Sequence, residues 1–92
     1  PGADVVLLIK PQFEVGRTAV RGGLVTDPGS RIDAVAEVLW RAWDSGLGTR
    51  GIMVSPLIGT HGNTEFLAWF RQGSEGNPTE WLDRVNVLAG AK

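Results

Sequence analysis

Asp4-Val5-Val6-Leu7-Leu8-Ile9-Lys10-Pro11 is the stretch that decides the fold class. Its uninterrupted apolar run, rich in β-branched residues, is typical of a strand buried on both faces of a parallel sheet. Pro11 biases Lys10 toward an extended backbone and ends the strand's hydrogen-bonding ladder. Because only Pro1-Gly2-Ala3 precedes this strand, we expect its missing neighbour to lie in upstream sequence or in another chain.

Composition sets the outer limits on fold and function. The chain has 92 residues, of which 42% are hydrophobic and 21% charged, which is typical of one soluble globular domain at most. The absence of cysteine excludes disulfides and thiolate metal sites. A formal net charge of -1 does not suit a stand-alone nucleic-acid binder, although it permits local basic patches. The longest apolar run falls far short of the roughly 20 residues of a membrane span, so we expect no membrane partner.

A helix is predicted after a long loop. Apolar residues recur at helical spacing from Arg31 to Ser45, with Ser30 as the expected N-cap and Gly46 as the left-handed residue that ends the helix. Trp40 and Trp43 lie on or beside the apolar stripe. We therefore expect both indoles to pack against a sheet.

Two more strands and a second helix follow. Residues 49–54 form the second predicted strand, and residues 64–71 form a third whose two faces are both largely apolar, which indicates an internal strand. Glu65 is anomalous there, as a carboxylate at the start of an interior strand. Asn77 is the expected N-cap of a helix over Pro78–Ala89.

The loop Pro11–Gly29 shows neither helical nor strand periodicity. At about 19 residues it exceeds the usual connection, and such loops are commonly functional, although a solvated surface excursion is an open alternative. Arg17 and Arg21 in this loop either contact RNA phosphates or are ordinary solvated arginines. Phe13 either stacks on a base or holds the loop onto the core, and we favour core packing.

The order of elements fits an α/β fold, the second half of a doubly wound domain. The short connection between the last two strands makes them antiparallel neighbours. A parallel strand, a crossover helix and a terminal antiparallel pair are the usual ending of Rossmann-like class I methyltransferase folds. We therefore expect about three strands, the last pair antiparallel, with two helices.

Specific strings carry a family resemblance. They are Leu7-Leu8-Ile9-Lys10-Pro11-Gln12-Phe13-Glu14-Val15-Gly16, Gly22-Gly23-Leu24-Val25 with Asp27-Pro28, Ser55-Pro56, and Gly62-Asn63-Thr64-Glu65-Phe66. With these strings, from about Asp4 to Arg71, the chain resembles the C-terminal part of the TlyA family, haemolysin-A-like rRNA 2′-O-methyltransferases related to FtsJ.

The resemblance implies a domain plan. Family members join an S4-type RNA-binding domain to an S-adenosylmethionine-dependent methyltransferase domain. Residues 1–92 would be the C-terminal part of the latter, while the S4 domain and the cofactor-binding half would lie upstream. No G-x-G-x-x-G fingerprint occurs here, so the cofactor-binding residues are unknown and this fragment alone is expected to be inactive.

The resemblance also implies a catalytic tetrad of Lys, Asp, Lys and Glu, whose third and fourth members match Lys10 and Glu65. Lys10 would accept the proton of a ribose 2′-hydroxyl or orient that hydroxyl, and Glu65 would orient Lys10. Without the resemblance, both residues read as ordinary charged groups, a solvated lysine and a salt-bridge partner. His61 has no second nitrogen or sulfur ligand, so no metal site is expected. Asn63 either bonds near Glu65 or shapes a turn.

The leading prediction is therefore the C-terminal catalytic portion of a cytoplasmic rRNA 2′-O-methyltransferase that uses S-adenosylmethionine and acts on rRNA or ribosomal subunits. The rival is a non-catalytic RNA-docking or assembly module. In either case, the open edge of the first strand predicts that the fragment associates with itself or with the missing N-terminal half.

Overall fold

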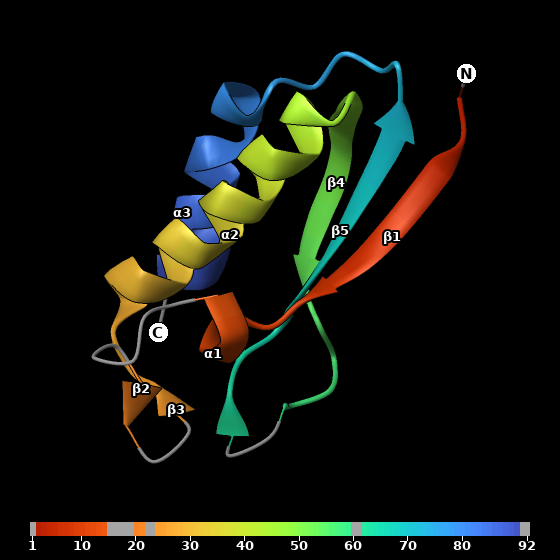
Figure 1. The fold of residues 1–92 in the computed structure, drawn as a ribbon. Coiled ribbons are helices and arrows are strands. Elements are labelled where there is room, and N and C mark those ends of the chain that lie inside the picture. The colour runs from red at the N-terminus through yellow and green to blue at the C-terminus, as the bar shows by residue number, and fades with distance from the viewer. Residues whose placement is uncertain (1, 15–19, 22–23, 60–61, 91–92) are drawn as a thin grey trace.

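The computed structural model describes residues 2–14, 20–21, 24–59 and 62–90. Three strands form the main sheet in the order β1 (Asp4–Ile9), β5 (Phe66–Gln72), β4 (Leu47–Val54), and β5 is antiparallel to both neighbours. Hence β1 and β4 run parallel to each other, and α2 (Pro28–Asp44) connects them as a crossover helix (Figure 1). The expected antiparallel terminal pair and internal last strand are confirmed.

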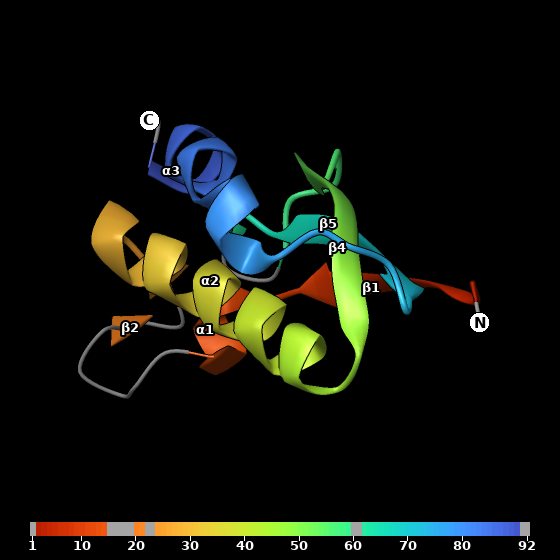
Figure 2. The ribbon, with the colours of Figure 1, turned by 90° about the horizontal axis from the view of Figure 1, so that it is seen from above.

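The hydrophobic core lies between the sheet and the two long helices. Alternate residues of β5, Phe66, Ala68 and Phe70, are fully buried and pack in one cluster with Leu39 of α2 and Val85 of α3 (Leu82–Gly90). Both helices lie on the same side of the sheet (Figure 2). Burying each large apolar side chain contributes about 1.5–3 kcal/mol, so this cluster is the main source of the fold's stability.

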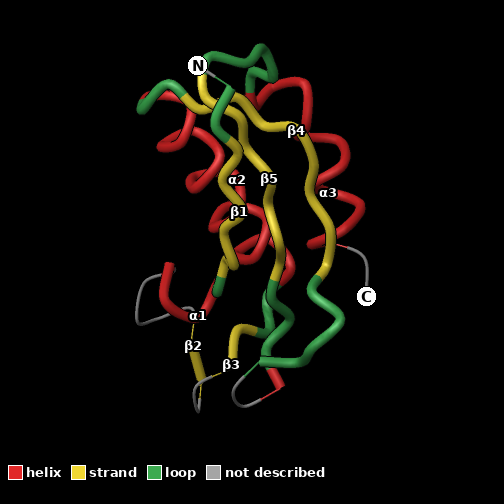
Figure 3. The backbone as a smooth tube through the Cα atoms, turned by 90° about the vertical axis from the view of Figure 1, so that its right-hand side faces the viewer, coloured by secondary structure: helices red, strands yellow, loops and turns green. Residues whose placement is uncertain are grey.

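The prediction that the first strand is buried on both faces is wrong for the described structure. β1 pairs only with β5, and Val6, Leu7 and Leu8 are exposed, Val6 at 63%. β5 pairs with one edge of β1. Among the described residues, no element covers the opposite edge or one of the two faces of β1. The far side of the sheet is bare in Figure 3, where the strands stand in front of the helices.

The helix α2 begins earlier than expected, and its buried stripe includes Val35 and Leu39 of the expected apolar stripe. Asp27, not Ser30, is the N-cap, and its carboxylate accepts hydrogen bonds from the Gly29 amide at 3.2 Å and the Ser30 hydroxyl at 3.0 Å. Proline fits the first helical turn because no hydrogen bond is required from its nitrogen there. The buried residues are Ala34, Val35, Leu39 and Ala42.

The expected burial of both tryptophans against the sheet is wrong. Trp40 is 37% exposed, and Trp43 is only half-buried. The buried stripe of Ala34, Val35, Leu39 and Ala42 permits a closer approach of α2 to β4 and α3 than two indoles would allow. The helix-ending role of Gly46 is confirmed, because its φ is +89°.

The segment expected to be one long loop contains short elements. A turn of helix, α1 (Pro11–Glu14), follows β1 directly, and β2 (Val20–Arg21) pairs antiparallel with β3 (Leu24–Val25). Phe13 does not anchor this segment in the core, because its side chain is 75% exposed. These elements lie at the end of the sheet where β1 ends and β5 begins (Figure 1).

The C-terminal part follows the sequence pattern closely. The Asn77 side chain caps a 3-10 turn, η3 (Pro78–Trp81), by accepting a hydrogen bond from the Thr79 amide at 2.8 Å. The turn then continues into α3. Among the helices of the described residues, none is long and apolar enough to cross a membrane.

Candidate active site

The strand register brings the two sequence-predicted catalytic residues to the same end of the sheet. β1 and β5 pair antiparallel, with Asp4 opposite Arg71 and Ile9 opposite Phe66. Lys10 follows Ile9 and Glu65 precedes Phe66, so the two are the next residues along this register. Antiparallel neighbours in register share one face of a sheet, which makes this juxtaposition a direct consequence of the pairing.

Glu65 is buried, with 6% of its surface exposed. Its Oε2 accepts a hydrogen bond of 2.8 Å from the Nε2 of Gln12. A methyl group added at Gly59 would overlap the carboxylate, so this glycine lets the loop backbone pass directly against it. The backbone of Glu65 is tied to the end of β4, since its carbonyl accepts from the Ser55 amide at 2.8 Å. A buried carboxylate needs such contacts to offset its lost hydration.

Gln12 lies in the turn that Pro11 starts immediately after Lys10. Pro11 is buried, and the Lys10 carbonyl accepts a hydrogen bond from the Phe13 amide at 2.9 Å, which closes the turn. Sequence reasoning missed Gln12, although it stands within the Lys10–Glu14 string that carried the resemblance. Its contact with Glu65 spans 53 positions, which no local pattern reveals.

The loop between β4 and β5 is held in place around the carboxylate. The Asn63 carbonyl accepts from the Gly59 amide at 2.8 Å, and the Ser55 hydroxyl accepts from the Leu57 amide at 3.2 Å. The side-chain oxygen of Asn63, a residue only 1% exposed, accepts from the Val25 amide at 2.9 Å. Asn63 therefore joins this loop to β3.

Lys10 is half-buried at the end of β1, with its ammonium 5.9 Å from the centroid of the Phe13 ring. This cation–π contact holds the side chain loosely, since such contacts contribute about 0.5–1 kcal/mol at exposed sites. No ion pair joins Lys10 to Glu65, both of which are described residues. The ammonium thus keeps its hydrogen bonds available for another partner.

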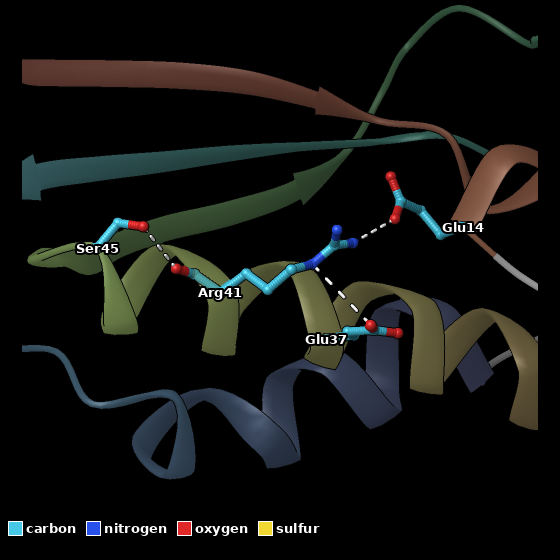
Figure 4. A network of polar contacts seen from close by, with 4 residues as sticks. All are labelled: Glu14, Glu37, Arg41 and Ser45. Carbon is cyan, nitrogen blue, oxygen red and sulfur yellow. Dashed lines mark hydrogen bonds and ion pairs between the residues drawn. The ribbon is translucent and has the colours of Figure 1, made fainter.

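The turn that carries Gln12 is also attached to the crossover helix. Glu14, its last residue, pairs with Arg41 of α2, whose Nε also lies 4.0 Å from a Glu37 carboxylate oxygen (Figure 4). One helical turn further on, the Ser45 hydroxyl donates to the Arg41 carbonyl at 3.1 Å. Such partly exposed pairs contribute little to stability, about 0–1 kcal/mol, but they set the orientation of α1.

The remaining sequence candidates are less well defined. Arg17 and His61 lie outside the described residues, and Arg21 is described only as a backbone position of β2. No group of three or more His, Asp or Glu side chains in the described part could hold a metal ion. The turns from strand to helix in this part, at Lys10-Pro11 and Asp27-Pro28, lack the glycines of a nucleotide-binding loop.

Comparison with known proteins identifies the chain's relatives. No family model matches it. Over 70 residues, it is 47% identical to the 16S/23S rRNA (cytidine-2'-O)-methyltransferase TlyA of Mycobacterium tuberculosis, in a match covering 75% of the chain and 26% of TlyA. The chain is homologous to a segment of the TlyA rRNA methyltransferases.

Other relatives agree with this homology to TlyA. YqxC of Bacillus subtilis, provisionally named an rRNA methyltransferase, is 38% identical over 91 residues, which cover 92% of the chain and 32% of YqxC. Structures provisionally named as hemolysins, from Streptococcus thermophilus and Lactococcus lactis, share the fold. The Streptococcus thermophilus structure has a TM-score of 0.76 and 32% identity, in a match covering 92% of this chain and 33% of that one. The Lactococcus lactis structure has a TM-score of 0.76 and 34% identity, in a match covering 90% of this chain and 43% of that one.

The expected TlyA resemblance and α/β fold class are therefore confirmed. The chain spans about a quarter to a third of the length of the curated relatives it matches.

Proposed function

We propose that this chain is part of an S-adenosylmethionine-dependent rRNA 2′-O-methyltransferase and that Lys10 and Glu65 belong to its catalytic centre. The observation that carries the proposal is the β1/β5 register. The last pair of this register is Ile9 and Phe66, so an unpaired lysine, Lys10, and a buried carboxylate, Glu65, come next at the same end of the sheet. The names of the homologues support methylation of rRNA. Residues 1–92 would form the C-terminal part of the FtsJ-like domain, with the S4 domain outside them.

The reaction moves a methyl group from a sulfonium sulfur to the ribose O2′. The carbon–sulfur bond breaks as the carbon–oxygen bond forms, and the 2′-hydroxyl proton passes to a base. S-adenosylmethionine, when bound, supplies the methyl group. We place the residues that bind it outside residues 1–92, because the turns at Lys10-Pro11 and Asp27-Pro28 do not carry the glycine-rich pattern of a nucleotide-binding loop.

Lys10 would bind the 2′-hydroxyl and receive or orient its proton. Its position at the carboxyl end of β1 supports this role, because ligands of open α/β sheets bind beyond the carboxyl ends of the strands. Glu65, fixed beside it, would hold the ammonium in place and counter its charge. Neither role requires the two side chains to be paired before RNA binds.

RNA would reach this end of the molecule through the segment after α1. β2 and β3 lie at that end in Figure 1, so Arg21 would contact phosphates of rRNA or of a ribosomal subunit in the cytoplasm. Arg17, which lies outside the described residues, is proposed for the same role from the sequence alone. Such contacts position the substrate and make its affinity depend on salt.

The test is single-turnover methyl transfer by the intact protein on ribosomal substrate, measured alongside RNA and cofactor binding. Lys10→Ala should lower the rate by about 10²–10⁴ with little change in cofactor affinity. Glu65→Gln should also lower the rate, and the double variant should lose less than the product of the two effects, because the residues act as one unit.

Arg21→Ala is the matched charge-removing control. It should weaken RNA affinity and reduce its salt dependence, while the chemical step at saturating RNA stays unchanged. Near-normal chemistry in both Lys10→Ala and Glu65→Gln would contradict the proposal and favour a non-catalytic RNA-docking or assembly module.

A further inference from the structure

We infer that Gln12 is a positioning residue that sets the orientation of the Glu65 carboxylate for the reaction. The inference rests on the proposed catalytic role of Glu65. The two side chains are 53 positions apart in the sequence: Gln12 lies in α1 after the first strand, and Glu65 immediately precedes β5. The hydrogen bond of 2.8 Å between Nε2 and Oε2 joins them.

The carboxylate has little freedom in this arrangement. Gln12 holds Oε2, while the backbone at Gly59 lies so close to the carboxyl group that even one methyl group would not fit between them. Rotation of the carboxylate would break the first contact or collide with the second. Oε2 is thereby engaged, and we assign to Oε1 the contact with the Lys10 ammonium when RNA is bound.

Backbone contacts fix the position of the turn that carries Gln12. Buried Pro11 and the Phe13-to-Lys10 hydrogen bond fix the turn, and the Glu14 contact with Arg41 attaches that turn to α2. The amide therefore reaches Glu65 from a turn that is hydrogen-bonded at its start and joined to α2 at its end. Supporting contacts of this kind typically alter activity by about 10–100-fold at sites where ligand orientation matters.

The two polar atoms of the Gln12 amide have opposite effects on stability. The Oε1 of Gln12 is buried and has no hydrogen-bond partner among the described residues. An unsatisfied buried acceptor costs about 1–3 kcal/mol. This cost offsets part of the stabilisation that the Nε2 donor gives to the buried Glu65 carboxylate.

Gln12→Met in the intact protein tests the inference, because it keeps the side chain's length and removes the donor. We expect a 10–100-fold lower kcat, unchanged KM for RNA and for S-adenosylmethionine, and a lower melting temperature, because the buried Glu65 carboxylate loses its donor. Gln72→Ala is the matched control: this exposed glutamine lies at the other end of β5, and its loss should leave kcat unchanged.

The exchanged pair, Gln12→Glu with Glu65→Gln, separates orientation from packing. It keeps an amide–carboxylate hydrogen bond but moves the charge, so the melting temperature should return while kcat stays low. Recovery of kcat by the exchange, or wild-type kcat in Gln12→Met alongside a defective Glu65→Gln, would overturn the inference and leave the proposed function standing. Normal kcat in Glu65→Gln would instead remove the catalytic role on which both depend.

Discussion

At Gly59, a single missing methyl group gives the Glu65 carboxylate its room. The backbone φ of this glycine lies outside the left-handed region, so alanine is tolerated by the main chain and only the contact changes. We expect Gly59→Ala in the intact protein to displace the carboxylate and lower kcat at least 10-fold. Steady-state kinetics with RNA and cofactor varied in turn would show this.

Gly62→Ala is the control for disturbance of the same loop. Gly62 has a φ of +82° with nothing near its Cβ position, so alanine there strains the backbone without touching Glu65. An equal loss of kcat in both variants would mean that loop conformation, and not the carboxylate contact, limits the reaction.

Asp4 shows a second residue-scale effect, on the open strand. Hydrogen bonds from Trp69 and Arg71, at 3.0 and 2.9 Å, lower the pKa of this carboxyl below its ordinary value of 3.8. The lowered pKa means that the ionised form stabilises the fold above the ordinary value, and this contribution is lost as the pH falls through the lowered pKa. NMR titration of the Asp4 carboxyl carbon should show the shift.

Arg71→Gln removes one of these donors and the nearby positive charge, so the pKa of Asp4 should move back toward 3.8. Asp4→Asn should be less stable than the wild type at neutral pH, and the difference should shrink in acid. Because the carboxyl is exposed, both effects should be small and screened by salt. An Asp4 pKa at or above the ordinary value would contradict this account.

At the scale of elements, the turn between β5 and η3 is fitted against β4. The Gly76 carbonyl accepts from the Thr49 amide at 3.0 Å, and a Cβ on Gly76 would overlap the Thr49 carbonyl at a φ of +119°. Gly76→Ala should therefore destabilise this region by about 3 kcal/mol or more, from strain and overlap together. Hydrogen exchange of the β4 amides in the intact protein would measure it.

Gly73 offers a comparison within the same turn. Its φ is +72°, but nothing lies near its Cβ position, so Gly73→Ala should cost only about 1 kcal/mol. Similar losses in the two variants would show that the β4 contact at Gly76 does not matter.

At the scale of the whole molecule, the sheet has one covered and one bare face. The bare face presents Val6, Met53 and Trp69 around a shallow apolar groove, next to the open edge of β1. We expect the isolated 92-residue chain to self-associate through this surface, because exposed apolar patches and open strand edges favour pairing. Sedimentation across a range of concentrations would detect the association.

The double variant Val6→Lys with Met53→Lys should shift the isolated chain toward monomer, since two charges on the bare face oppose its burial. Lys substitution at Val87, an equally exposed apolar residue of α3 on the covered side, should leave association unchanged. A wild-type chain that is monomeric at every concentration would contradict this prediction.

The sequence alone determined the features that depend on near neighbours. The strand before Lys10, the left-handed end at Gly46 and the cap at Asn77 were all predicted, because β-branched runs, glycine conformations and capping hydrogen bonds involve only a few consecutive residues. The apolar residues on both faces of the stretch 64–71 also predicted an internal strand, and β5 does pair along both of its edges, although one of its faces is bare.

Only the tertiary structure decided what lies across from what. The same apolar run at Val5–Ile9 is compatible with an internal or an edge strand, and the sheet order made it an edge strand among the described residues. Trp40 is partly exposed because α2 packs against the rest of the molecule through Ala34, Val35, Leu39 and Ala42. The Gln12–Glu65 hydrogen bond depends on β1 and β5 pairing in register, and sequence patterns carry no information on side-chain distances across such a separation.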